Sequence, residues 1–254
     1  MIAAMLISTP ALAFDYMGPT TSRLKDSGKV SIGGEYFWSK MEIDADGLPS
    51  LDLTSDTIDD FEMDKTTANL ALGMGRGSEI FFRFGVTDAD PDNNSDWGGI
   101  PDNMGSSDEV LALGGGAKWT LYDDGNFGWG ILSQMSWAEY DFDGRSYSVG
   151  THSVTLSPEF EIIEVQIATG PTFKFNKDLM VFGGPFLYFL NGDADFEGTI
   201  DGSPADISAD IDQESLLGGY IGAELGLGEN ALISFEVQAT SGSHGMGGQF
   251  VWKF

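Results

Sequence analysis

The sequence contains no cysteine, which excludes disulfide frameworks and thiolate metal sites. It has few basic residues: 12 lysines and arginines stand against 40 aspartates and glutamates, for a formal net charge of -28. Because such a charge repels phosphates, nucleic acid is excluded as a partner. No apolar run reaches the roughly 20 residues that a membrane helix needs, since the longest uncharged apolar stretch after the N-terminal run, 179–190, has about 12. If the chain spans a membrane, it does so with strands.

Alternating apolar and polar residues recur along most of the chain, a pattern typical of strands with one apolar face. In the first such segment, Ile32, Tyr36 and Trp38 share one face and Glu35 lies on the other. The stretch 179–190 is apolar on both faces, so its orientation is not assigned. Ten segments follow this plan: 29–40, 67–74, 80–87, 110–122, 127–140, 160–175, 179–190, 215–227, 231–240 and 246–254.

Short turns and long loops alternate between these segments. Turns rich in Gly, Asn and Asp lie near 76–78, 123–126, 176–178 and 228–230, as tight hairpins need. The connections between them are long, at about 44–64, 88–109, 141–159 and 191–214, with a brief one near 241–245. Well over half of the 40 acidic residues lie in the four long loops, where Arg145 is the only lysine or arginine.

Short turns at one rim and long acidic loops at the other are typical of an up-and-down barrel that crosses a membrane, with both termini at the short-turn rim. The sequence therefore predicts an all-β fold, a closed antiparallel transmembrane β-barrel of about ten strands over residues 28–254. Eight or twelve strands also fit the pattern, because the 141–163 region has room for an extra bend.

The first thirteen residues form a short apolar run that ends on Ala11, Leu12 and Ala13, the usual shape of a secretory cleavage site. The basic residues expected before such a run are missing, so a start upstream of Met1 and an ordinary apolar strand both stay open. We expect export, with 1–13 as the remnant of a signal peptide and 14–27 as an N-terminal periplasmic segment.

The chain ends in GQFVWKF, in which Phe250, Trp252 and Phe254 point to one side of a strand. This ending resembles the closing strand of Gram-negative outer-membrane β-barrels. The resemblance covers 28–254 as architecture but only the last strand as a motif, and it indicates no subfamily. It implies a location in the cell outer membrane with periplasmic termini, contact with outer-membrane lipid, and recognition of these three aromatics by the barrel-assembly machinery. We expect a monomer.

Aromatic residues gather at the ends of the predicted strands, where amphipathic rings favour the membrane interface. We expect two girdles. One lies towards the long loops and the other towards the short turns. The first comprises Tyr36, Trp38, Trp137 and Tyr188, and the second comprises Trp119, Trp129, Phe173, Phe175, Trp252 and Phe254.

The polar faces of the strands carry charges that would point into the barrel. A barrel of eight to ten strands has room for side chains but not for a wide aqueous channel, and buried charges persist only when they are paired. We therefore expect a polar network that largely plugs the lumen, and the alternative is a narrow porin that prefers cations and passes small solutes. The charged residues are Glu35, Arg83, Lys118, Glu224 and Glu236.

Candidate metal chemistry is limited to acidic stretches. Asp88, Asp90 and Asp92 have the spacing of a calcium loop, but the glycine at the sixth position and the acid at the twelfth are missing. A solvated acidic loop is the simpler interpretation, and 191–198 is a weaker case. Divalent cations that bridge the acidic rim to anionic lipid headgroups stay open as partners.

Candidate catalytic groups are equally few. The two histidines are His152, beside Ser153, and His244, beside Ser243, and neither neighbourhood matches a hydrolase motif. We therefore expect no enzyme and no cofactor, but a structural or surface-interaction role in the envelope. The alternatives are a lipid-modifying or proteolytic outer-membrane enzyme and a secreted β-sandwich that binds sugar or protein. Strand exteriors almost free of charge argue against the sandwich.

Overall fold

The structure is a computed structural model, and it describes residues 14–45, 56–91, 107–142, 145–149, 152–212 and 216–254. Over these ranges, no helix is long and apolar enough to cross a membrane. The regular elements there are strands: β1 (Val30–Ala45), β2 (Asp56–Gly75), β3 (Ser78–Pro91), β4 (Val110–Asp123), β5 (Phe127–Asp141), β6 (Arg145–Val149), β7 (His152–Lys174), β8 (Leu179–Ile200), β9 (Ser203–Asp212), β10 (Leu216–Gly226), β11 (Ala231–Ala239) and β12 (His244–Lys253).

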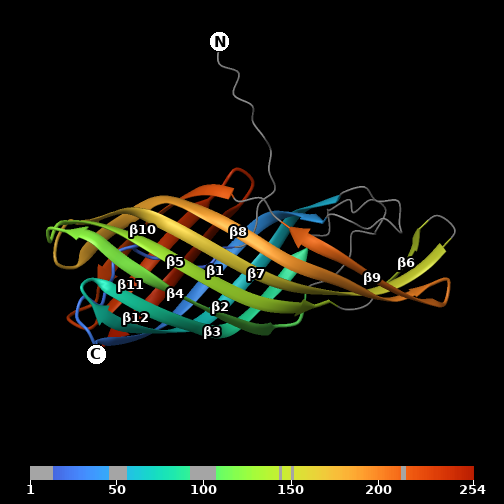
Figure 1. The fold of residues 1–254 in the computed structure, drawn as a ribbon, viewed down its shortest axis with the longest axis horizontal. Helices are drawn as coiled ribbons and strands as arrows, with labels where there is room; N and C mark the ends of the chain where they lie inside the picture. Colours follow the sequence, from blue (N-terminus) through green and yellow to red (C-terminus); the bar gives the residue numbers. More distant parts are fainter. Residues whose placement is uncertain (1–13, 46–55, 92–106, 143–144, 150–151, 213–215) are drawn as a thin grey trace, which may run out of the picture.

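Ten of these strands close into a barrel (Figure 1). Hydrogen-bonded neighbours follow the order β7, β5, β4, β3, β2, β1, β12, β11, β10 and β8, and β8 pairs with β7 to complete the ring. Each barrel strand therefore has a partner on both sides, which a bilayer requires because it offers the backbone no water. The prediction of a closed antiparallel barrel of about ten strands is confirmed.

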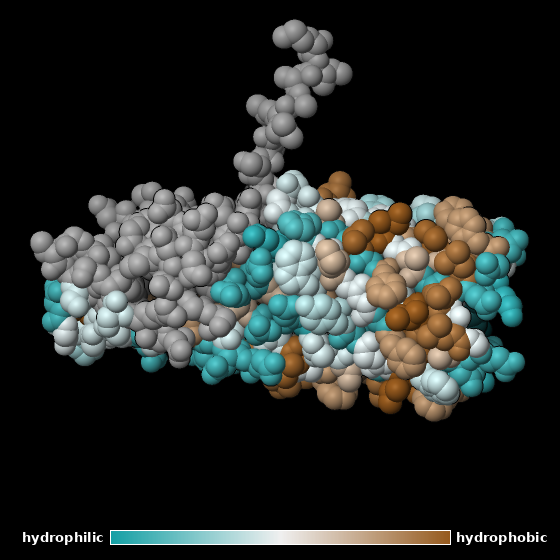
Figure 2. Space-filling model, turned by 180° about the vertical axis from the view of Figure 1, so that it is seen from behind, coloured by the Kyte–Doolittle hydropathy of each residue, from teal (hydrophilic) through white to brown (hydrophobic). Residues whose placement is uncertain are grey.

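The register of the strands places their apolar faces on the outside of the barrel. Ile32 pairs with Trp252 on one side and with Leu70 on the other, and all three side chains point outwards. Phe82 is 60% exposed and Leu111 is 56% exposed, and they belong to a set of exposed apolar side chains on nearly every strand of the ring, which is a larger apolar surface than a soluble fold leaves to water. Figure 2 shows apolar residues gathered in a band on the barrel, next to hydrophilic residues at its end.

The register also settles the orientation of β8, the strand that is apolar on both faces. Phe182, Phe186 and Tyr188 are buried in the lumen, whereas Leu187 and Phe189 are exposed on the outer wall. Periodicity could not distinguish these faces, because the lumen at this level is lined by apolar side chains as the outer wall is.

The long hairpin of β7 and β8 extends beyond the barrel. The two strands stay paired from Lys174 and Met180 to Val154 and Ile200, while β10 accompanies β8 only to Tyr188. β6 and β9 add to its outer edges, which gives a four-stranded blade in the order β6, β7, β8, β9 that projects from the end of the barrel away from the C terminus (Figure 1).

The blade corrects the prediction of loops at 141–159 and 191–214, since most of their described residues are paired strand. Alternation marks this extension in the sequence as well. Phe160, Ala194 and Phe196 are buried on one face, while Glu159 and Asp195 are exposed on the other. The acidic composition of this stretch is typical of a loop, although these side chains form the solvent-exposed face of a sheet.

Residues 14–24, which we call the N-terminal plug, lie inside the barrel. Phe14, Tyr16, Met17 and Leu24 are each no more than 4% exposed. This corrects the expectation of a periplasmic segment at 14–27. Apolar side chains spaced along so short a segment gain free energy from burial, and the lumen is the nearest cover. Residues 25–29 are exposed and lead from the plug into β1 at the short-turn rim.

Candidate functional site

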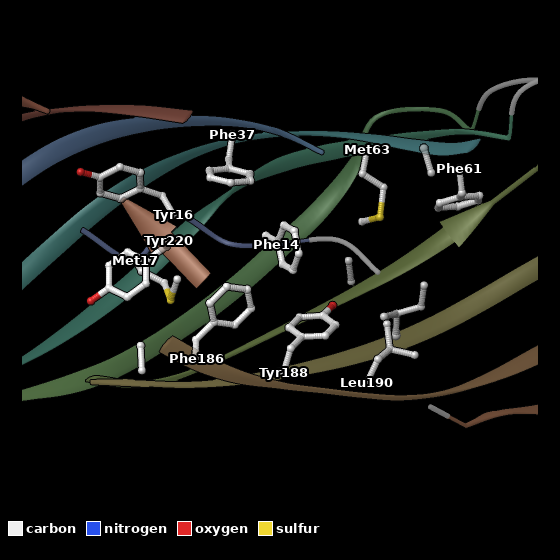
Figure 3. Packing of buried hydrophobic residues seen from close by; sticks show 14 of the residues in the cluster. Phe14, Tyr16, Met17, Phe37, Phe61, Met63, Phe186, Tyr188, Leu190 and Tyr220 are labelled. Carbon is white, nitrogen blue, oxygen red and sulfur yellow. The ribbon is translucent and has the colours of Figure 1, made fainter. Parts of the chain in front are cut away.

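The N-terminal plug begins in the half of the lumen that lies towards the blade, where it meets inward-facing aromatic side chains. The ring of Phe14 stands edge-on to Phe186 and Tyr188, with ring centroids 5.4 and 5.6 Å apart. Figure 3 shows Phe14 enclosed between these rings and those of strands on the opposite wall. This half of the lumen is apolar, and its buried side chains include Phe37, Phe61, Met63, Tyr140, Phe160, Ile162 and Leu190.

Two carboxylates of the barrel wall bind the main chain of the plug. Glu236 on β11 accepts hydrogen bonds from the N–H groups of Met17 and Gly18, at 2.9 and 2.7 Å. Glu79 on β3 accepts from the N–H groups of Arg23 and Leu24, at 2.8 and 3.0 Å. Both glutamates are buried, so these charge-assisted bonds satisfy carboxylates that would otherwise be costly in the lumen.

Donors from other strands bind the carbonyl groups of the same segment. Arg83 Nη2 donates to the carbonyl oxygen of Tyr16 at 2.6 Å, and Lys118 Nζ donates to that of Met17 at 2.8 Å. Gln238 Nε2 reaches the carbonyl oxygen of Asp15 at 2.8 Å. The wall therefore pairs with successive main-chain groups of a segment that makes no sheet of its own, as buried backbone requires.

Ion pairs fix the side chains of the plug. Lys65 on β2 bridges Asp15 of the plug and Glu164 of β7, with Nζ 3.2 and 2.6 Å from the two carboxylates. Arg23 Nε lies 2.7 Å from Glu224 on β10. All these side chains are largely shielded from water, so removal of one partner leaves an uncompensated buried charge.

Two glycines allow the plug to follow this path. Gly18 has a φ of 65°, in the left-handed region, and turns the chain just before Pro19. Gly130, which faces the lumen from β5, lies against the plug so closely that a Cβ there would be 2.5 Å from the carbonyl oxygen of Thr20. A larger residue at either position would force the plug to move.

The structure brings the five expected lumen charges inside the barrel. Arg83 Nε lies 2.6 Å from Glu35, which also accepts a hydrogen bond from Asn69 at 3.0 Å. Glu224, Lys118 and Glu236 contact the plug rather than one another, as described above. The network therefore runs through the N-terminal segment, which sequence reasoning had placed outside.

Several members of this network were missed. Asp15 and Arg23 lie in the segment assigned to the periplasm, and Lys65 and Glu79 lie just outside the predicted strand ranges. Alternate residues of a strand share a face, and this could have placed the last two. Lys65 lies on the same inward face of β2 as Asn69, and Glu79 lies on the same inward face of β3 as Arg83. Glu164 belongs to the polar face of a predicted strand, and only its pairing with Lys65 shows its place in the network.

The expected interface aromatics are on the outer wall, except Tyr188, which is buried in the lumen because its place in β8 turns it inwards. Trp38 and Trp137 are half-buried there, and Phe250 is exposed on β12 in line with Trp252. Others are well exposed: Tyr36 is 51%, Trp119 45%, Trp129 38%, Trp252 44% and Phe254 67% exposed.

The residues weighed and set aside as catalytic or metal-binding candidates are scattered. His244 stands edge-on to Trp38, with ring centroids 5.6 Å apart, and the hydroxyl of Ser243 is buried. His152 begins β7, and its side chain is outside the description. Asp88 and Asp90 are in β3, whereas Asp92 lies outside the described residues. Over the described ranges, no group of three or more His, Asp or Glu could hold a metal ion.

The short-turn rim carries a carboxylate with a perturbed titration. Asp124 accepts hydrogen bonds from the N–H groups of Phe127 and Asn126, at 2.8 and 3.0 Å, in the turn between β4 and β5. These bonds favour the ionised form and lower the pKa of Asp124. The ionised carboxylate of Asp124 therefore stabilises the turn between β4 and β5.

No protein-family model and no curated protein matches the sequence. Solved structures are similar over most of the chain. The outer membrane protease OmpT from Escherichia coli is 10% identical, with 94% of this chain and 97% of that chain covered and a TM-score of 0.49. Ail, the attachment invasion locus protein of Yersinia pestis, is 16% identical, with 90% and 99% covered and a TM-score of 0.34. The translocator domain of the autotransporter NalP from Neisseria meningitidis is 11% identical, with 91% and 90% covered and a TM-score of 0.48.

At these identities, no residue role passes from those proteins to this chain. The fold itself is settled by the coordinates: a closed antiparallel ring of ten strands with an apolar outer wall. This is the architecture of Gram-negative outer-membrane β-barrels, and the resemblance seen in the last strand is confirmed at that level, without a subfamily. The protein therefore has the fold of a strand-built membrane barrel.

Proposed function

We propose that this protein is a non-catalytic outer-membrane barrel that its own N-terminal plug closes to solutes and that presents the blade to the exterior. The plug supports this proposal most directly. Phe14 to Leu24 fill the lumen and bind the wall through buried ion pairs and main-chain hydrogen bonds. A path for water or ions would have to displace these contacts, each of which is costly to leave unmade.

Conductance tests the closure. Purified protein in planar lipid bilayers is expected to give no steady current, because the plug and the apolar half of the lumen leave no continuous aqueous path. Steady openings with cation selectivity would overturn the proposal. They would favour the second candidate, a cation-preferring pore, which one observation supports: carboxylates outnumber basic side chains among the lumen residues Asp15, Glu35, Glu79, Glu164, Glu224, Glu236, Arg23, Lys65, Arg83 and Lys118.

The blade is proposed as the surface-interaction element. Its outer face carries aligned acidic residues: Glu161 pairs with Asp193, and one step further Glu159 pairs with Asp195, while Glu139 on the neighbouring β5 also pairs with Glu161. These side chains are exposed. Directly opposed like charges destabilise a sheet, so this face is better suited to cationic partners or divalent ions than to the anionic groups of neighbouring lipids.

The orientation follows the layout of the two rims. We place the C terminus and the short turns in the periplasm, and the blade outside the cell, as a monomer in contact with outer-membrane lipid. Because the chain has no cysteine, single cysteines in place of the exposed Ser203 in the blade and the exposed Glu229 in a short turn report the orientation. A membrane-impermeant thiol reagent on whole cells should label only the first. Labelling of the second cysteine alone would show that the short turns, and not the blade, lie outside the cell.

A further inference from the structure

The contacts of the N-terminal plug are unusual for a segment of a protein core, because many of them are made to its main chain. Glu236 and Glu79 accept from four plug N–H groups, while Arg83 and Lys118 donate to two plug carbonyl oxygens. A wall that binds main-chain groups with charged side chains has the chemistry of a peptide-binding site, where donors and acceptors of the ligand backbone are paired by the receptor.

The plug is also attached to the barrel as a ligand on a tether. Residues 25–29 are exposed, and Gly28 has a φ of 81° in the turn that leads into β1. The main chain of the plug takes part in none of the strand pairings of the ring, so the barrel is complete without it. Its side chains also contact the wall, among them Phe14 with aromatic rings, Asp15 with Lys65, and Arg23 with Glu224.

We propose that the lumen is a binding site for an extended peptide and that residues 14–24 occupy it as a ligand in cis. The site takes a peptide with an aromatic residue followed by an acid, a glycine that adopts a left-handed turn, and an arginine five residues beyond that glycine. A peptide of this chemistry presented in trans competes for the same wall groups. This inference rests on the proposed function, since a lumen already open to solutes would not need a ligand to close it.

Peptide exchange in a nicked barrel tests the proposal. A specific protease sequence inserted between Ser27 and Gly28 is cut after the full chain has folded in lipid vesicles. The probe is a synthetic peptide of residues 14–27 with a fluorophore at its C-terminal end, which leaves towards the short-turn rim. Fluorescence anisotropy is expected to show uptake of the probe as the cut segment leaves. Circular dichroism reports whether the nicked barrel stays folded.

Backbone-modified peptides separate main-chain recognition from packing. N-methylation at Met17 or Leu24 removes an N–H group that Glu236 or Glu79 binds, and we expect binding about tenfold weaker or worse. The matched control is a peptide with leucine in place of Met17, which keeps the N–H group and is expected to bind within about threefold of the parent. The barrel variant E236Q should weaken binding of the parent peptide, and E229Q, in an exposed turn, should not.

Two results would overturn the inference. One is a nicked barrel that stays folded but takes up no probe below its unfolding temperature, which would make the plug a fixed part of the core. The other is equal binding of the parent and the N-methylated peptides. Either result leaves the conductance of the uncut protein unaffected, so a failure here is distinct from a failure of the proposed closure.

Discussion

The ion-pair triad of Lys65, Asp15 and Glu164 allows a quantitative test of the N-terminal plug. In K65M the side chain keeps its length and apolar stem but loses the charge between two carboxylates. Lys65 is 6% exposed and Glu164 4% exposed at the side chain, and their atoms are 2.6 Å apart. Breaking such a buried pair costs about 3–5 kcal/mol, because the remaining carboxylates are left without a counter-ion.

The measurement is the free energy of unfolding in urea, with the barrel in lipid vesicles and tryptophan fluorescence as the signal. The matched control is K177M, since Lys177 is 89% exposed and its removal should change stability by less than about 0.5 kcal/mol. The double variant K65M/E164Q removes one stranded carboxylate and should be more stable than K65M alone. The reasoning would be refuted by a loss below about 0.5 kcal/mol in K65M, or by a double variant in which the two losses simply add.

Three further predictions concern the plug, a turn and the last strand. G130V should push the plug from β5 and open a measurable conductance, while G34V, whose Cβ on the outer wall meets open space, should stay closed; equal conductance in both would contradict the packing. Because its pKa is lowered, Asp124 stabilises the fold above about pH 3.9, the value of an unfolded aspartate, and this contribution is lost as the pH falls through the folded pKa. D124A should thus be less stable than the wild type at pH 7 and equally stable in acid. D124N, which keeps a hydrogen-bond acceptor, should lose this pH dependence. If D124A were destabilised equally at both pH values, the lowered pKa of Asp124 would not be the cause. F254S removes a 67% exposed ring and should change the unfolding free energy by less than about 0.5 kcal/mol yet lower the yield in the outer membrane several-fold; unchanged yield would dismiss the assembly signal.

Local alternation was enough to predict the barrel wall. The side chains of Ile32, Phe82 and Leu111 all point outwards, and each followed from a period of two within its own segment. Turn residues then set the order of hairpins, and the backbone requirement of a bilayer left closure as the only outcome. In β8 both faces are apolar, so the sequence could not predict which face points into the lumen.

The contents of the lumen could be predicted only in part. The inward charges Glu35, Arg83, Lys118, Glu224 and Glu236 followed from parity, but their partners did not. Arg83 on β3 binds Glu35 on β1, two strands away, and Tyr16 of the plug, and no spacing in the sequence connects these three residues. The blade was missed for a different reason: its acidic face resembles a loop in composition, and this composition hid the alternation that the pairing of β7, β8 and β9 makes plain.

The amino-acid sequence by itself determined the strands of the barrel and which of their faces is apolar, because the pattern that decides this is local to each strand. Only the tertiary structure decided what fills the barrel. The N-terminal plug finds its partners on nearly every strand of the ring, and such contacts exist only once the ring has closed around the segment. A periodicity describes which way a side chain points, whereas the identity of the group it meets depends on closure in three dimensions.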